Sequence, residues 1–409
     1  MAKEAVVIGA GIIGLCSAEA LLLHGFRVTI LDREQAGSSA SFGNGGLVVP
    51  SHFEPLASPG LLAAGLRMML RRGSPFGFRS LPSAEVLGWI MKLMRAANPQ
   101  AVERASSVLL AMNLASRELY ETHFADLTFD YARTGELMIC RTAQALKAET
   151  SLAETAAKLG LEVEVVGREG LRQLDPNFEI DAAGGVFFAD DARLSPPAFM
   201  QSLTGRLKRS DVRIQEGVEV SAIEADRVVT SVGEFKADLT VVAAGAWSGT
   251  LCRTVGIRLP LLGGKGYGFT LPDLPAMPQL PGILVEARVA YNPVPEGLRF
   301  VGAMELGPAV PQPDDHRRIA GMQTAITAAF PQLRPAAFPS EVWSGMRPCS
   351  PDGLPYVGRL TRAPNCIVAT GHGMMGMSLG PITGHLVGEI AANQKPSIPL
   401  DLLNPERYA

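Results

Sequence analysis

The chain has 409 residues, of which 47% are apolar, 19% are charged and 6% are aromatic. This composition is typical of a folded globular protein and excludes a largely disordered one, and the length indicates about two or three domains. The formal net charge of −3 gives no electrostatic basis for binding nucleic acid.

The cysteines and the lengths of the apolar stretches indicate in which cellular compartment the protein lies. The five cysteines are scattered and form no CxxC pair, which indicates a reducing compartment and argues against a disulfide framework or a zinc site. No spacing of His, Asp and Glu favours a metal site either. Because no stretch approaches the roughly 20 apolar residues that cross a bilayer, we expect a cytoplasmic protein, free or bound peripherally to the inner face of the cell membrane.

The chain begins with a pattern typical of dinucleotide binding. The apolar strand Ala5–Ile8 runs into a GxGxxG motif, Gly9, Gly11 and Gly14, which opens an apolar helix. The first glycine allows a tight turn, the second lets backbone N–H groups approach a pyrophosphate, and the third lets the helix pack closely on the strand. The positive end of the helix dipole then faces the phosphates.

Three further features support a dinucleotide site, and the last two of them favour FAD over NAD. A second strand, Arg27–Leu31, ends at Asp32, where a carboxylate can accept hydrogen bonds from ribose hydroxyls. The loop Gly37–Gly46 offers closely spaced hydroxyls, an amide and glycines that suit a long polar cofactor. A late apolar strand within Ala237–Ser248 extends the nucleotide fold further along the chain than an NAD enzyme usually needs. An NAD-dependent dehydrogenase is the least favoured alternative.

The remaining elements suggest an α/β architecture with an insertion. Residues 59–180 are largely helical in pattern, residues 256–342 combine many prolines with short strand-like pieces, and the last helix is expected near Met375–Asn393. We predict a Rossmann-like FAD-binding domain of the glutathione-reductase type, assembled from residues 1–58, 181–255 and 343–409. An inserted α+β substrate or cap domain would comprise residues 59–180 and 256–342.

Four separated motifs resemble the D-amino-acid oxidase family of flavoproteins. They are Gly9–Gly14 with Leu31–Glu34, then Ala40–Gly46, Val241–Ser248, and the tail pair Trp343–Gly358 and Ala369–Gly376. Within the family, Lys265–Tyr267, Arg299–Leu306 and Asn404–Tyr408 are most similar to the bacterial D-amino-acid dehydrogenase branch. The resemblance spans nearly the whole chain, is loose between about 59 and 180, and is less specific for the substrate than for the family.

By position, the resemblance implies which residues contact FAD. The pyrophosphate contacts would be Gly9, Gly11, Ile12, Ile13 and Gly14, and the adenosine contacts Asp32, Arg33 and the backbone of Val218. The flavin would be lined by Ser39, Ser41, Asn44, Gly45, Gly46 and Leu47, and the ribityl chain crossed by Ala244, Gly245 and Trp247. The flavin C2=O would be capped by Gly371, His372, Gly373, Met374, Met375 and Gly376. This cap lies at the start of the last helix, whose dipole stabilises a reduced, negatively charged flavin.

The resemblance also bears on how FAD is attached. Related sarcosine oxidases link their flavin to a cysteine seven residues before the aspartate of a Thr/Ser-Pro-Asp motif. Counting back from Asp352 gives Gly345 at that position, while Cys349 is nearby but displaced. We therefore expect FAD to be bound without a covalent link.

The best candidate for binding a substrate carboxylate is Arg347. Its planar guanidinium can grip a carboxylate through two parallel hydrogen bonds, and the equivalent arginine of the family's Gly-x-Arg-Pro turn has this role. Tyr267 and Tyr291 are candidates for assisting the carboxylate or shielding the site, with ordinary packing as the alternative. Arg299 and Glu305 lie on one expected strand, and we interpret them as a structural ion pair.

Two histidines are candidates for the site. His372 lies in the flavin-capping turn, so we expect it to contact flavin, and His52 follows the flavin loop. Hydride transfer from a neutral amine does not require an enzymic base, so acid–base work by His372 is the less favoured interpretation.

The resemblance implies FAD-dependent oxidation of a small D-amino acid or a cyclic imino acid such as D-proline or its hydroxylated forms. Hydride would pass from Cα to flavin N5, and the electrons then to a quinone-type acceptor or an electron-transfer partner. The alternatives are an oxygen-using sarcosine, glycine or opine oxidase and a non-catalytic flavoprotein. The amphipathic, basic segment Leu61–Arg72 is either a packed domain helix or a membrane contact that would suit a quinone acceptor. Nothing in the sequence defines the oligomeric state.

Overall fold

The computed structural model describes residues 2–36, 38–60, 74–79, 83–334, 338–339 and 341–408. A six-stranded sheet has the order β19-β20-β13-β1-β2-β9, and all its pairs are parallel except β19 with β20. Its strands are β1 (Glu4–Ile8), β2 (Arg27–Leu31), β9 (Arg213–Gln215), β13 (Leu239–Val242), β19 (Tyr356–Arg359) and β20 (Cys366–Thr370). A small antiparallel sheet comprises β10 (Val220–Ile223), β11 (Arg227–Thr230) and β12 (Gly233–Lys236).

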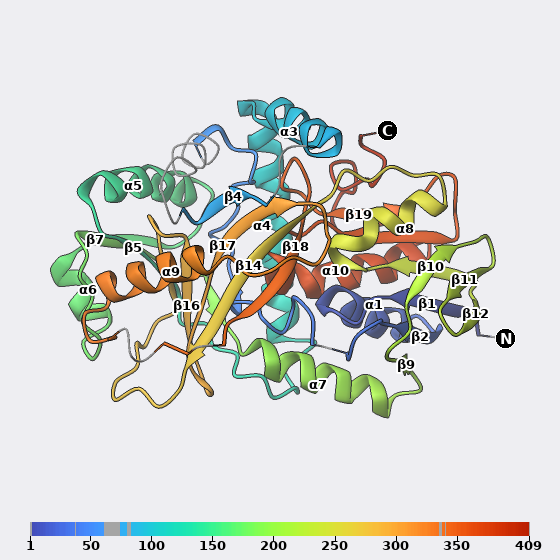
Figure 1. Ribbon diagram of the computed structural model, residues 1–409, viewed down its shortest axis with the longest axis horizontal. Helices are drawn as coiled ribbons and strands as arrows, with labels where there is room; N and C mark the ends of the chain where they lie inside the picture. The colour runs from blue at the N-terminus through green and yellow to red at the C-terminus, as the bar shows by residue number, and fades with distance from the viewer. Residues whose placement is uncertain are drawn as a thin grey trace.

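A nine-stranded sheet occupies the other half of the molecule (Figure 1). Its order is β18-β14-β17-β16-β15-β5-β7-β6, and β4 pairs with β17. Its strands are β4 (Phe76–Phe78), β5 (Glu136–Cys140), β6 (Val163–Gly167), β7 (Gly184–Phe188), β14 (Leu262–Leu271), β15 (Gly282–Leu284), β16 (Val289–Val294), β17 (Gly297–Gly307) and β18 (Trp343–Cys349). Strands β3 (Leu47–Val48) and β8 (Ala192–Arg193) form a separate pair.

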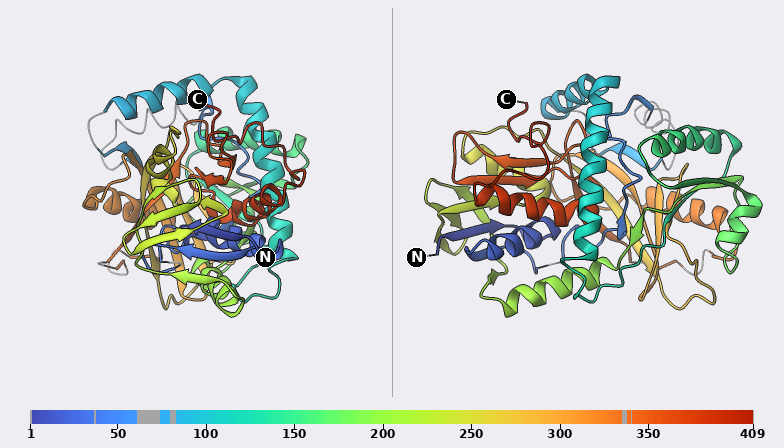
Figure 2. Two further views of the ribbon diagram at one scale, coloured as in Figure 1. Left: turned by 90° about the vertical axis from the view of Figure 1, so that its right-hand side faces the viewer. Right: turned by 180° about the vertical axis from the view of Figure 1, so that it is seen from behind.

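The helices divide between the two halves. Those around the six-stranded sheet are α1 (Ile12–Leu23), α4 (Pro99–Glu121), α7 (Pro196–Arg209), the 3₁₀ turn η1 (Gly245–Trp247), α8 (Ser248–Thr254) and α10 (Gly376–Ala391). Those beside the nine-stranded sheet are α3 (Ala84–Ala96), α5 (Ala143–Lys158), α6 (Arg168–Leu174) and α9 (His316–Ala329). In Figure 2 the long α4 crosses the molecule beside α10. Among the described residues, no helix is long and apolar enough to cross a bilayer.

Helices α1 and α10 pack against each other, and both are buried over most of their length. Their apolar side chains therefore run all round the helix, as is typical of a helix with neighbours on every side. Close approach requires glycine: a Cβ at Gly384 of α10 would lie 2.4 Å from the carbonyl oxygen of Cys16 in α1. This packing places the N-termini of α1 and α10 close to each other.

We expect Gly384→Ala to lower the free energy of unfolding by about 1–3 kcal/mol, because the added methyl group forces α10 away from α1. Thermal unfolding of the purified protein checks this prediction. Gly88→Ala is the matched control, since Gly88 is also helical and a Cβ there meets nothing within 4 Å. An unfolding temperature of Gly384→Ala equal to that of the control would contradict the packing argument.

The predicted α/β fold class, a mostly parallel sheet with a second part that contains its own sheet, is confirmed. The predicted domain boundaries stay a prediction, and sheet membership departs from them at two strands. Strands β7 and β18, which these boundaries assign to the FAD-binding domain, belong to the nine-stranded sheet. In contrast, α4, which they assign to the substrate domain, shares a core with α1 and α10 through residues such as Leu109 and Tyr120. The segment Leu61–Arg72 lies outside the described residues.

Candidate active site

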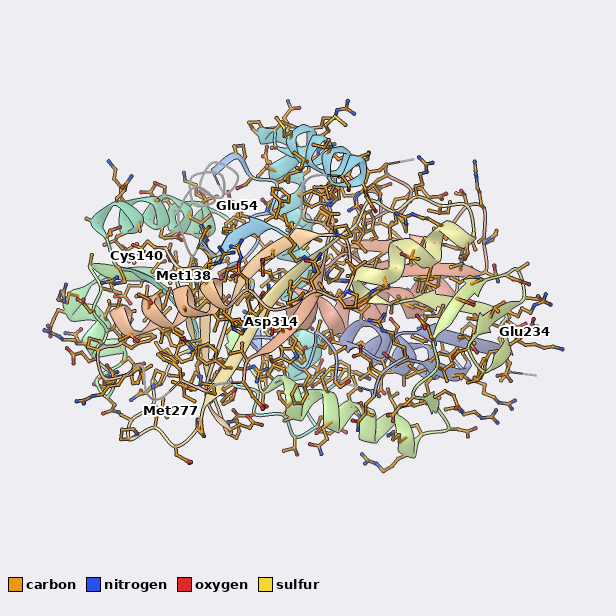
Figure 3. The ribbon with its side chains drawn as sticks, in the orientation of Figure 1. Glu54, Met138, Cys140, Glu234, Met277 and Asp314 are labelled. Atoms are coloured by element: carbon orange, nitrogen blue, oxygen red, sulfur yellow. The ribbon has the colours of Figure 1, made fainter. Side chains whose placement is uncertain are left out.

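A cavity of about 1120 Å³ is lined by residues of both large sheets. This is more than the volume of a pocket for one drug-sized ligand, as a long cofactor together with a substrate requires. Of the residues predicted to hold FAD, the following line it: Gly9, Gly11, Ile12, Ile13, Asp32, Arg33, Ser39, Ser41, Asn44, Gly45, Leu47, Val218, Ala244, Gly245, Trp247, Gly371, His372, Gly373, Met374, Met375 and Gly376. Glu54 and Met138, labelled in Figure 3, mark the part of the wall nearest β5.

Gly14 and Gly46 are the two predicted FAD residues that do not line the cavity. Each instead allows the backbone conformation or packing of a segment that does. A Cβ at Gly14 would lie 1.8 Å from the carbonyl oxygen of Gly9, so this glycine lets α1 pack on the turn before it. Gly46 has a φ of 77° and adjoins the Leu194 carbonyl, so it serves the conformation of the flavin loop.

The start of α1 is suited to a pyrophosphate. Gly9 turns the chain with a φ of 105°, and a Cβ there would lie 2.5 Å from the carbonyl oxygen of Ala243. The helix has no acidic residue in its first turn, and its N-cap, Gly11, supplies no side chain. Ser41 Oγ accepts a hydrogen bond from the Ile12 N–H at 2.9 Å and so brings the flavin loop against this turn. The remaining first-turn N–H groups have no carbonyl partner within the helix.

The adenosine end is marked by Asp32 and Arg33. The Asp32 carboxylate accepts hydrogen bonds from the N–H groups of Ala10 at 2.6 Å and Glu34 at 2.9 Å, which fixes it beside the glycine turn. The Arg33 guanidinium lies 3.8 Å from the ring centre of Trp247, so two predicted cofactor residues from different segments stack on each other.

The flavin loop is held by β16 and β17. Arg299 donates from Nε to the Asn44 carbonyl at 2.7 Å and from Nη2 to the Phe42 carbonyl at 2.8 Å. Asn292 Nδ2 donates to the Gly45 carbonyl at 2.9 Å. The predicted ion pair between Arg299 and Glu305 is therefore wrong. Glu305 pairs instead with Arg318, 3.1 Å away. Six residues of extended strand place Arg299 about 20 Å from Glu305, too far for an ion pair.

The flavin-capping turn presents a neutral histidine. His372 is 3% exposed, its Nε2 lies 2.9 Å from Thr383 Oγ1, and its Nδ1 has no hydrogen-bond partner among the described residues. Burial lowers the pKa of His372 to about 3. Helix α10 begins at Gly376 with no side-chain cap and no acidic residue in its first turn. An unpartnered buried nitrogen and a second uncapped helix start on the same cavity fit the carbonyl groups of a flavin.

The pKa of His372 gives stability a defined pH dependence. The folded value of about 3 lies below the ordinary 6.5, so between these values the unfolded chain binds more protons and stability falls as the pH falls. This residue contributes a slope of up to about 1.4 kcal/mol per pH unit in that window. We expect His372→Gln to lose this contribution, measured by denaturant unfolding at several pH values. Equal slopes in the two proteins would show that the folded imidazole is not held neutral.

Arg347 lines the cavity and, like Arg288, forms no ion pair with an acidic side chain among the described residues. It lies on β18 opposite Gly264, and its Nη1 donates to the Ala303 carbonyl at 2.6 Å. The side chain occupies space above Gly266, where a Cβ would lie 1.9 Å from Nη1. Ala303 is the bulged residue of β17 and has a φ of 57°, so a strained backbone turns this carbonyl toward the arginine. Burial lowers the pKa of Arg347, and an anion beside it would offset that cost.

Neither predicted tyrosine is among the residues that line the cavity, and their interpretation as substrate contacts is corrected accordingly. Tyr267 is fully buried on the opposite face of β14, where its hydroxyl lies 2.5 Å from Glu305 Oε1. Tyr291 is also fully buried and packs its ring on Phe330. Both belong to the core between the nine-stranded sheet and α9.

The structure adds cavity residues that were not predicted. An apolar portion of the wall consists of Phe76, Phe78, Trp89, Ile90, Leu93 and Met346. His52, which was a candidate from the sequence, lines the cavity together with Ser51, which was not. No local pattern marks the apolar residues as a group, because β4, α3 and β18 are brought together only by the fold. Among the described residues, no group of three His, Cys, Asp or Glu side chains is placed to bind a metal ion.

A glycine turn after β1, two helix starts on one cavity whose N-cap residues supply no side-chain hydrogen bond, and a second sheet carrying an arginine without an ion pair are together typical of a flavin-dependent oxidoreductase. The model of the family described as FAD dependent oxidoreductase matches residues 4–390, and the chain belongs to this family. The predicted FAD and the predicted enzyme class are thereby confirmed.

The chain is similar in sequence to two bacterial dehydrogenases and in fold to two solved structures. D-amino acid dehydrogenase from Bradyrhizobium diazoefficiens is 28% identical over 422 residues, covering 99% of each chain. D-amino acid dehydrogenase from Vibrio atlanticus is 28% identical, covering 99% of this chain and 100% of its own. The fold is similar to glycine oxidase from Geobacillus kaustophilus, with a TM-score of 0.79, 19% identity and full coverage of both chains. L-proline dehydrogenase from P. horikoshii has a TM-score of 0.77 at 19% identity, covering 100% of this chain and 98% of its own.

Proposed function

We propose that the chain oxidises the Cα–N bond of a D-amino acid or of a cyclic imino acid similar to D-proline or hydroxyproline. The observation that carries the proposal is Arg347, a cation on the cavity wall with no carboxylate partner among the described residues. A substrate carboxylate supplies that partner through two parallel hydrogen bonds. The full-length relatives named D-amino acid dehydrogenase support this substrate class.

The described residues bind and orient the substrate. When bound without a covalent link, FAD supplies a two-electron acceptor for the hydride that leaves Cα. The Ala303 carbonyl fixes the guanidinium of Arg347 and so the direction in which the carboxylate is held. The apolar wall formed by residues such as Phe76 and Trp89 contacts the substrate side chain and excludes water. The imine product then hydrolyses, or stays cyclic when the substrate is an imino acid.

A quinone-type acceptor is part of the proposal, and helix α3 supports it. Leu87, Met91 and Met94 form an exposed apolar stripe on this helix, with Met94 68% exposed. Ile90, Leu93 and Met94 of the same helix line the cavity. An apolar stripe beside the cavity suits a hydrophobic acceptor at the inner face of the cell membrane, or an electron-transfer partner.

Anaerobic reduction of the bound flavin tests the substrate class. D-amino acids, imino acids and N-alkyl amino acids are mixed separately with the yellow protein, and loss of flavin absorbance is followed. We expect D-amino acids or cyclic imino acids to bleach the flavin and glycine or sarcosine to be poor. Bleaching by sarcosine or glycine alone would overturn the substrate class, and no bleaching by any amine would favour a non-catalytic flavoprotein.

The acceptor is tested separately in steady state. Turnover with an artificial quinone is compared with turnover in which oxygen is the only acceptor. We expect the quinone reaction to be much faster. An equally fast oxygen reaction would identify an oxidase.

A further inference from the structure

A pair of buried carboxyl groups lies behind the cavity and has no role in the proposed binding of FAD or substrate. Glu136 begins β5 and Asp191 precedes β8, and the side chains of both are fully buried. Glu136 and Asp191 share a side-chain hydrogen bond, which requires a proton on one of the two carboxyl groups, and the Glu136 oxygens accept no other hydrogen bond among the described residues. Buried acids that are neither ion-paired nor fully hydrogen-bonded are costly, so they are retained where protonation is part of their role.

Asp191 is tied to the loop that continues from the flavin loop. Its carboxylate accepts hydrogen bonds from Ser51 Oγ at 2.5 Å and from the Ser51 N–H at 3.0 Å. Burial raises the pKa of Glu136 well above its ordinary value, and the neighbouring Asp191 carboxyl raises it further. Burial also raises the pKa of Asp191, to about 7, although the bonds from Ser51 oppose this. The pair therefore holds at least one proton at neutral pH and can accept another.

His52 connects this pair to the cavity. Its Nε2 lies 3.4 Å from Glu136 Oε2, and the residue itself lines the cavity. Burial, and then the charge of Arg288, lower the pKa of His52 to about 4. The ring is therefore neutral at neutral pH, with one nitrogen able to accept a proton and the other able to donate one.

Other titratable groups surround the three residues. The charge of Arg288 acts on His52, that of Asp190 acts on Asp191, and Tyr291 interacts electrostatically with Glu136. Beyond these, Glu149 interacts with Arg288, Glu54 and Glu286, and Tyr291 interacts with Asp175. Tyr291 is uncharged at neutral pH because burial raises its pKa. The electrostatic potential at His52, Glu136 and Asp191 therefore depends on Arg288 and the neighbouring acids.

We infer that His52, Glu136 and Asp191 form a proton-accepting site that takes the proton lost by the substrate ammonium before oxidation. The inference rests on the proposed function, because an amino acid arrives as an ammonium ion and only its neutral amine can release hydride from Cα. It adds three residues to the reaction. His52 takes the proton at the cavity wall, and the carboxyl groups of Glu136 and Asp191 behind it hold that proton.

The substrate N–H bond breaks, its electron pair stays on nitrogen, and the free nitrogen of the His52 ring takes the proton directly or through water. His52 Nε2 passes a proton to Glu136, and the carboxyl pair gains one proton in total. The neutral amine then loses hydride from Cα to bound FAD, which is reduced by two electrons, and the substrate leaves as an iminium ion. Product release returns the stored proton to solvent.

The test is the pH dependence of anaerobic flavin reduction in Glu136→Gln, which keeps the shape of the side chain but cannot accept the proton. At neutral pH we expect the rate constant to fall about a hundredfold, the usual scale for loss of a general base. Above the pKa of the substrate ammonium, solvent supplies the neutral amine, and the rate constant should approach that of the wild type. Asp175→Asn is the matched control, a buried acid with a raised pKa that does not contact His52, and its profile should keep the wild-type shape.

A second readout does not depend on turnover. The infrared spectrum of the holoenzyme should contain the C=O band of a buried, protonated carboxyl group, and Glu136→Gln should lack it. If Glu136→Gln does not fold, His52→Gln should show the same pH-dependent loss of rate while keeping the infrared band. A rate lowered by one constant factor at every pH, or an infrared spectrum that is the same in wild type and Glu136→Gln, would overturn the inference. Failure of every amine to reduce wild-type flavin would instead refute the proposed function, and the infrared result would still decide whether the pair is protonated.

Discussion

Replacing Arg347 by leucine should weaken substrate binding by about 3–5 kcal/mol, because two charge-assisted hydrogen bonds to the carboxylate are lost. This corresponds to roughly a 10²–10⁴-fold rise in the apparent dissociation constant. The measurement is the concentration of D-amino acid that half-saturates anaerobic flavin reduction. The fold should survive, since the guanidinium has one hydrogen bond, to Ala303, and no acidic partner among the described residues.

Arg347→Lys separates charge from geometry. Lysine keeps the cation but cannot make two parallel bonds, so we expect it to recover only part of the affinity. The flavin spectrum of both variants should match the wild type in the absence of substrate. Wild-type affinity in Arg347→Leu would remove this residue from the site.

Gly14→Ala is expected to abolish retention of FAD. The added methyl group would lie 1.8 Å from the Gly9 carbonyl oxygen, so α1 must shift away from the turn that faces the pyrophosphate. We expect the purified variant to be colourless, with at least about a hundredfold weaker binding of added FAD, a loss of roughly 3 kcal/mol. Absorbance of the flavin and titration of the apoprotein measure both effects.

The control for Gly14→Ala is another helical glycine with room around it. A Cβ at Gly205 of α7 meets only the flexible end of Arg209, at 3.4 Å. Gly205→Ala should therefore stay yellow. A Gly14→Ala protein that is equally yellow would show that the close contact between helix and turn is not required for the cofactor.

The parts of the fold that follow from local sequence could be predicted. Strand β1, the glycine turn, α1 and β2 are consecutive, and their chemistry is determined within about 30 residues of chain. The expected last helix corresponds to α10, because its apolar run follows a glycine-rich turn. All the residues predicted to hold FAD except Gly14 and Gly46 line one cavity, because most of their motifs lie at the end of a strand or the start of a helix.

The residues that sequence reasoning misassigned depend on which face of a strand is covered. Tyr267 shares a face of β14 with Phe269, and both lie in the core against α9, whereas Gly264 and Gly266 adjoin the space of Met304 and Arg347. Alternation along the strand predicts two faces but does not say which one the cavity occupies. The bulge at Ala303 is likewise invisible in the sequence, because a non-glycine residue rarely adopts a positive φ.

The buried carboxyl pair could be found only from the three-dimensional structure. Glu136 and Asp191 are far apart in sequence and meet because β5 pairs with β7, and His52 reaches them from the end of the flavin loop. No spacing of residues signals such a group. The sheet membership of β7 and β18 differs from the predicted boundaries for a similar reason, since strand pairing over long separations decides which sheet a strand joins.

The most direct measurement is a crystal structure of the yellow protein grown with a non-oxidisable carboxylate ligand. We expect density for a flavin ring between the Gly9 turn and the Gly371–Gly376 turn, with the ligand carboxylate hydrogen-bonded to both terminal nitrogens of Arg347. A ring elsewhere, or a carboxylate bound away from Arg347, would contradict it.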